Sequence, residues 1–166
     1  MTTPNRSRSN TSRLIVTTPS DREIKLVREF DAPRDLLFEA FSSCQHVQAW
    51  WGQAGSTMPV CELDFREGGK WRFVEREADG SEWAFRGEYR EIARPERLVQ
   101  TFEFEGMPGH VSLETSVFED LGGRTRLVTT SVFDSKEDRD GMIQSGMEKG
   151  AGEGYDRLED YLTSLR

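Results

Sequence analysis

The segment between the first main strand and the first hairpin constrains the fold of this chain more than any other part of the sequence. It opens with Phe30-Asp31-Ala32-Pro33, in which an Asx side chain and a proline favour the first turn of a helix. Ser42-Ser43 can cap a second short helix, and Trp50-Trp51-Gly52 ends that helix. A strand over 24–30 precedes the segment, and hairpin signals follow it. This order predicts two short helices that support one end of an antiparallel sheet.

The middle of the chain, over 57–133, alternates strand-like segments with turn signals, of which Asp79-Gly80 is the strongest. Residues of one parity are bulky and those of the other are charged, which is typical of an antiparallel meander with one wet face. We expect the wet face to carry Arg72, Glu82, Arg86, Glu88, Glu103 and Glu114. Beside the aromatic residues, we expect the inner face to carry Cys61, Leu63, Phe65, Val111, Leu113 and Val117.

The C-terminal region predicts one long final helix, capped by Asp134 or Ser135 and packed on the inner face of the sheet. Its apolar stripe, at spacings of three and four, consists of Met147, Ala151, Tyr155, Leu158, Leu162 and Leu165. Gly146, Gly150 and Gly154 lie on one side of this helix. They either leave open volume above a cavity or allow close packing of the backbone, and the sequence leaves both interpretations open.

Length, charge and cysteine content limit the class of protein. The 166 residues fit one domain, which we expect over 13–166, behind a disordered tail over 1–12. The formal net charge of −8 argues against nucleic acid as a partner, and no apolar stretch is long enough for membrane insertion. Cys44 and Cys61 lack metal-ligand spacing. We therefore expect two free thiols in a cytoplasmic protein.

Several short motifs, taken in their order from about Leu14 to Leu165, resemble those of one superfamily. The chain is similar to the START-like (SRPBCC) helix-grip superfamily. Within it, the chain resembles the bacterial branch related to the C-terminal domain of the ATPase activator of the ninety-kilodalton heat-shock chaperone. The motifs are Phe30-Asp31-Ala32-Pro33, Trp50-Trp51-Gly52, Gly68-Gly69-Lys70-Trp71, Gly87-Glu88-Tyr89, Pro95-Glu96-Arg97-Leu98, Gly123-Arg124-Thr125-Arg126-Leu127, Ser145-Gly146-Met147-Glu148 and Tyr155-Asp156-Arg157-Leu158.

The resemblance implies an α+β helix-grip fold, in which a curved antiparallel sheet wraps around the C-terminal helix and encloses an apolar cavity. Relatives carry lipids, sterols or polyketides, and some cyclise or hydrolyse the bound molecule. The implied function is binding of a hydrophobic, lipid-like or aromatic molecule by a carrier, sensor or sequestering protein. The alternatives are a cyclase or hydrolase, and a protein-interaction module or chaperone ATPase regulator. Pairing into a homodimer stays open.

Aromatic side chains and methionine suit the wall of such a cavity, because they offer large apolar surfaces with few polar demands. Polar groups that border it on this interpretation are Glu75, His110 and Glu148, although we expect Glu75 to reach water at a hairpin tip and His110 to be a solvated loop residue. The sequence contains no pattern that predicts a catalytic group, a cofactor or a metal site. The candidate wall residues are Trp50, Trp51, Trp71, Phe73, Trp83, Phe85, Tyr89, Phe102, Phe104, Met147 and Tyr155.

Overall fold

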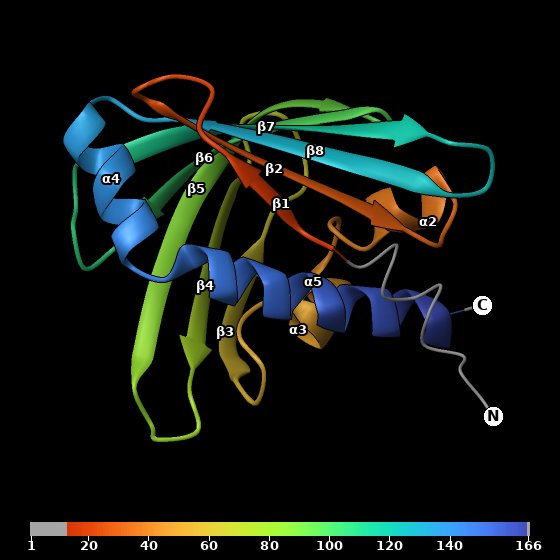
Figure 1. The fold of residues 1–166 in the computed structure, drawn as a ribbon. Helices are drawn as coiled ribbons and strands as arrows, with labels where there is room; N and C mark the ends of the chain where they lie inside the picture. Colours follow the sequence, from red (N-terminus) through yellow and green to blue (C-terminus); the bar gives the residue numbers. More distant parts are fainter. Residues whose placement is uncertain (1–12, 166) are drawn as a thin grey trace, which may run out of the picture.

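The computed structural model describes residues 13–165, in which an eight-stranded antiparallel sheet curves around a C-terminal helix (Figure 1). The spatial order of the strands is β1-β2-β8-β7-β6-β5-β4-β3. The tail expected over 1–12 lies outside the described residues. The strands are β1 (Ile15–Thr17), β2 (Glu23–Phe30), β3 (Thr57–Leu63), β4 (Lys70–Arg76), β5 (Glu82–Ala93), β6 (Arg97–Phe104), β7 (Val111–Asp120) and β8 (Thr125–Val132). The expected α+β helix-grip fold is confirmed.

Two short helices, α2 (Arg34–Glu39) and α3 (Cys44–Trp50), follow β2 as the sequence predicts. Pro33 is the N-cap residue of α2, and the Ser43 hydroxyl accepts a hydrogen bond from the His46 N–H at the start of α3. Each cap depends on one residue and its near neighbours in the chain. The starts of both helices can therefore be predicted from the sequence without knowledge of the tertiary structure.

The C-terminal region forms two helices, α4 (Lys136–Gln144) and α5 (Met147–Ser164), so the prediction of one continuous helix is wrong. Ser135 caps α4 as expected, because its hydroxyl accepts a hydrogen bond from the Asp138 N–H. Gly146 has a φ of 87°, a left-handed conformation that ends one helix and begins the next. Figure 1 shows α5 lying across the concave side of the sheet. Among the described residues, no helix has the length and apolarity needed to cross a membrane.

The core lies between the concave side of the sheet and the helices. Leu158 and Leu162 of α5 are fully buried, as the predicted stripe requires, and they join a cluster that includes Phe30, Phe38 and Phe118. We call the side of the sheet that carries Phe30 and Phe118 the inner face and the opposite side the outer face.

The register of β7 is opposite to the predicted one. Phe118 and Leu127 are paired across β7 and β8 and both are buried, so their parity defines the inner face. Glu114 shares the parity of Phe118, and it therefore lies on the inner face rather than on the wet face. Val111, Leu113 and Val117 lie on the outer face, contrary to our expectation. Apolar-inward alternation fails on β7 because small polar residues occupy its inner positions.

The two cysteines are not free thiols, which corrects the sequence prediction. Cys44 and Cys61 form a disulfide that joins the first turn of α3 to β3 over a sequence separation of 17. Sequence spacing gave no sign of this pairing because the two elements meet only in the folded chain. Disulfides persist mainly in oxidising compartments, so this bond is a feature uncommon in the cytoplasm. It also fixes the position of the helix that ends in Trp50.

Candidate functional site on the inner face

A row of aromatic side chains crosses the inner face over β4, β5 and β6. Consecutive ring centroids lie 4.7 to 6.0 Å apart, which is contact distance for tilted and edge-to-face pairs. We call this set the aromatic row; its members, in order of contact, are Trp51, Phe73, Trp71, Phe102, Phe85, Phe104 and Trp83. All seven are predicted wall residues, so the structure brings most of that set together.

Burial changes along the aromatic row. Trp71 and Phe73 are buried, whereas Phe85, Phe102 and Phe104 are half-buried. Trp83, at the far end, is 40% exposed. Trp71 and Phe73 therefore belong to the core, and the other members of the row keep surface that another molecule can contact.

The four remaining predicted wall residues lie apart from the row. Trp50 is buried, and its indole N–H donates to the Ala40 carbonyl over 2.9 Å. Tyr89 is buried against Phe65, and this burial raises the pKa of its hydroxyl. Met147 packs beside Phe133 and Ile24 in a second apolar cluster. These three residues therefore pack within the apolar clusters. The fourth, Tyr155, lies next to polar groups of the inner face.

Tyr155 projects from α5 toward the sheet. Its ring lies edge-on to Phe30, with centroids 5.7 Å apart. Burial raises the pKa of its hydroxyl to about 12, a hydrogen bond with Thr129 of β8 opposes that rise, and the neighbouring Glu114 carboxylate adds to it. The hydroxyl is therefore neutral at physiological pH and faces a polar part of the inner face.

Glu114 lies at the centre of this polar part. In the strand register it is opposite Gln100 of β6 on one side and Ser131 of β8 on the other. The Ser131 hydroxyl donates to the Glu114 carboxylate over 3.4 Å. Burial raises the pKa of the Glu114 carboxyl to about 7, although the side chain keeps some accessible surface.

Small hydroxyl side chains surround Glu114 on its own strand and on the next one. Ser116 and Thr129 are paired across β7 and β8, and their hydroxyl oxygens lie 3.0 Å apart. Ser112 of β7 is opposite Phe102 of β6, which places the aromatic row diagonally next to Glu114. We call Gln100, Glu114, Ser116, Thr129 and Ser131 the polar patch. It joins the aromatic row at Phe102.

None of the three polar groups predicted to border a cavity belongs to the polar patch. Glu75 is buried rather than exposed at a hairpin tip, because its carboxylate accepts a 2.8 Å hydrogen bond from the Gln53 N–H in the turn after α3. His110 is exposed, and its Nδ1 lies 2.8 Å from a carboxylate oxygen of Asp138. Glu148 is exposed on the first turn of α5.

Gly154 of α5 allows close packing. A Cβ at this position would lie 3.3 Å from the Gly52 carbonyl oxygen, so the helix approaches the turn after α3 at backbone distance. Arg157, one turn later, donates to the Gln53 carbonyl over 2.9 Å. At Gly150, by contrast, a Cβ would make only an ordinary 3.7 Å contact with the Gln53 side chain. Of the two interpretations, close packing applies to Gly154.

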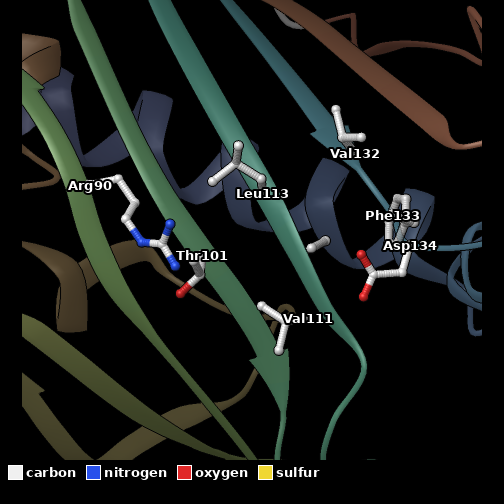
Figure 2. A pocket seen from close by; sticks show the side chains of 8 residues that line it. Arg90, Thr101, Val111, Leu113, Val132, Phe133 and Asp134 are labelled. Atoms are coloured by element: carbon white, nitrogen blue, oxygen red, sulfur yellow. The ribbon is translucent and has the colours of Figure 1, made fainter.

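Two shallow hollows lie on the outer face of the sheet. The first, of about 350 Å³, contains the exposed apolar side chains of Val111, Leu113 and Val132, with Arg90 and Asp134 at its edge. Figure 2 shows it on the side of the sheet away from α5. The second, of about 550 Å³, is lined largely by charged side chains such as Arg86 and Glu103, which already form an ion pair with each other.

The residue that sequence reasoning missed is Glu114. The sequence indicates a run of polar residues on one face of β7, because Ser112 and Ser116 share the parity of Glu114. Thr129 and Ser131 repeat the pattern on β8. Two neighbouring strands with polar residues on one parity and valines on the other predict a polar inner face as readily as a wet outer one.

Comparison with known proteins agrees with this fold. The sequence model of the family described as Activator of Hsp90 ATPase homolog 1-like protein matches residues 31–163. The chain belongs to this family. Members of the Activator of Hsp90 ATPase homolog 1-like family share the START/SRPBCC type of fold seen here. No match was found among curated proteins.

Solved structures of bacterial proteins superpose on this family member over most of its length. A Rhodobacter sphaeroides protein is 24% identical, with 92% of this chain and 99% of that chain covered and a TM-score of 0.84. For an Arthrobacter aurescens protein the identity is 25%, the coverage 90% and 91%, and the TM-score 0.81. Protein Ms6760 from Mycobacterium smegmatis is 21% identical, with 93% of this chain and 100% of that chain covered and a TM-score of 0.81. At these identities the similarity concerns the fold.

Proposed function

We propose that the inner face binds a small, largely apolar molecule, whose aromatic or lipid-like body lies against the aromatic row and whose polar group meets the polar patch. The observation that carries this proposal is the position of Glu114, a half-buried carboxyl placed diagonally to Phe102 in the middle of the row. Ligand sites in proteins combine apolar walls with a few well-placed polar groups, and this arrangement has both.

The polar patch lowers the stability of the folded protein. A carboxyl and several hydroxyls on the inner face of a sheet cost stability compared with apolar residues of the same size. Apolar valines occupy the outer face of the same strands, at Val111 and Val132, where they are exposed. This placement of polar residues inside and apolar residues outside is unfavourable for folding alone. Contact between a ligand and the inner face would account for it.

A second candidate function is acid–base catalysis on the bound molecule. The pKa of the Glu114 carboxyl, raised to about 7, supports this candidate, because an acid or base is most effective when its pKa is close to the working pH. Binding is the function that both candidates require, so it is tested first.

The test is fluorescence titration with a neutral apolar probe, phenylnaphthylamine, on the wild type and on two variants. Phe102→Ala removes the ring next to the polar patch and is expected to weaken binding roughly tenfold. Leu113→Ala truncates an exposed side chain on the outer face and is expected to leave the affinity within about twofold. Thermal unfolding of each variant controls for loss of fold. Equal affinities for all three proteins, or weakening by Leu113→Ala alone, would contradict the proposal.

A further inference from the structure

The charge balance of the inner face is uneven. Among residues 13–165, Glu114 forms no ion pair, and its one side-chain hydrogen bond comes from Ser131. The buried cation of the inner face, Arg28, lies against α5, where Asp156 and Glu159 neutralise it at 3.1 and 3.8 Å. Glu114 is thus an enclosed carboxylate without a counter-ion, a state that costs stability when the group is ionised.

The aromatic rings near Glu114 suit a counter-ion with an apolar organic body. Phe102 of the aromatic row lies diagonally next to Glu114, and the half-buried rings of Phe85 and Phe104 follow on one side. Aromatic faces attract cations through their quadrupole within about 6 Å, most strongly where water is excluded. The formal net charge of −8 also draws cations toward the molecule.

We propose that the inner face selects hydrophobic ammonium ions, with Glu114 as the counter-ion of the ammonium group and the aromatic row around the organic body. This inference rests on the proposed function, because it names the chemical class of molecule that the same site takes. The Gln100 carbonyl and the Ser131 hydroxyl supply further acceptors for the ammonium hydrogens.

The proposal predicts a pH dependence. The groups that face Glu114 are Gln100 from β6, Ser131 from β8 and Tyr155 from α5, and only Tyr155 among them titrates. Tyr155 stays neutral up to about pH 12, and Arg28, which lies beyond it on β2, stays charged. Ionisation of Glu114 therefore controls the charge of the polar patch, and affinity for an ammonium ion rises as that carboxyl loses its proton.

The experiment compares two probes with the same phenylbutyl body, the cationic phenylbutylamine and the neutral phenylbutanol, by isothermal titration calorimetry. We expect the wild type to bind the amine at least about tenfold more tightly than the alcohol at about pH 8. This preference is expected to shrink toward about pH 5, where Glu114 is protonated but the amine is still charged. Binding of both probes with equal affinity would overturn the inference and leave the proposed function intact, whereas binding of neither would overturn both.

Two variants locate the effect. Glu114→Gln keeps the shape of the side chain and removes its charge, so it is expected to abolish the preference for the amine over the alcohol. Glu62→Gln removes one negative charge from an exposed position on β3 and is expected to leave the preference unchanged. If Glu62→Gln reduces it as much as Glu114→Gln does, the effect is one of net charge and the inference is wrong. The wild-type preference and its pH dependence test the inference even if Glu114→Gln fails to fold.

Discussion

Arg28 on β2 and Asp156 on α5 hold the C-terminal helix against the sheet, with 3.1 Å between a guanidinium nitrogen and a carboxylate oxygen. The Arg28 side chain is fully buried, and its guanidinium also lies 4.9 Å from the centre of the Phe30 ring. The buried Glu159 carboxylate is 3.8 Å away on the same helix. This cluster fixes the distance between α5 and the inner face on which the proposed site lies.

Removal of Arg28 is therefore expected to be costly. Arg28→Ala removes a buried cation that lies 3.1 Å from the Asp156 carboxylate and 3.8 Å from the Glu159 carboxylate, and we expect the free energy of unfolding to fall by about 3 kcal/mol in urea titrations. The control is Arg126→Ala, which breaks partly exposed ion pairs to Glu29 and Glu119 on the outer face and is expected to cost far less stability than Arg28→Ala. Similar costs for the two variants would show that Arg28 does not anchor the helix.

The disulfide between Cys44 and Cys61 gives a second prediction. Reduction opens a loop closed over a sequence separation of 17 and is expected to lower the free energy of unfolding by roughly 3 kcal/mol through the entropy of the unfolded chain. The measurement is thermal unfolding with and without dithiothreitol, together with alkylation to count thiols. A Cys44→Ala/Cys61→Ala variant should be insensitive to the reductant. Full alkylation of the native, unreduced protein would mean that the bond does not form.

Alanine substitutions at two glycines distinguish a glycine required by close backbone packing from one that only lowers helix propensity. Gly87→Ala on β5 would bring its Cβ into collision with the Thr101 carbonyl oxygen, so we expect a strongly destabilised protein that loses several kcal/mol or fails to fold. Gly150→Ala on α5 meets no such obstacle and is expected to stabilise the protein by up to about 1 kcal/mol. Circular dichroism during urea unfolding measures both. A neutral Gly87→Ala would contradict the backbone packing described here.

The raised pKa of Glu114 links its protonation to stability. The carboxyl binds a proton more tightly in the folded protein, at about 7, than in the unfolded chain, at 4.5. Its contribution is therefore fully present below about pH 4.5 and is lost as the pH rises through about 7. We expect Glu114→Gln to gain up to about 3 kcal/mol relative to the wild type between these limits. Carbon NMR of the Glu114 carboxyl gives the pKa directly, and a value near 4.5 would refute this linkage.

The sequence predicts the elements of this fold better than it predicts the candidate site. The caps at Ser43 and Ser135 and the turn at Gly80 depend on neighbours in the chain, and they are all confirmed. The pairing of Cys44 with Cys61 depends on how distant elements meet, and it was not predicted. The break at Gly146, where the backbone turns left-handed, was not predicted either.

The polar patch shows why the site itself escaped prediction. Alternation along β7 identifies two faces but not which of them meets the helix, and the rule that apolar residues point inward assigned Glu114 to the wrong one. That rule describes a core. It fails where the inner face of a sheet carries polar groups, and such departures from the rule are expected at functional sites.

The most direct test of the central claim is an NMR measurement of intermolecular nuclear Overhauser effects between bound phenylnaphthylamine and the protein side chains. We predict contacts from the probe to the ring protons of Phe102 on the inner face and of Tyr155, which projects from α5 toward that face. Contacts to the methyl groups of Leu113 and Val132 instead would place the ligand in the outer hollow. That result, or the absence of any contact at saturating probe, would contradict the account.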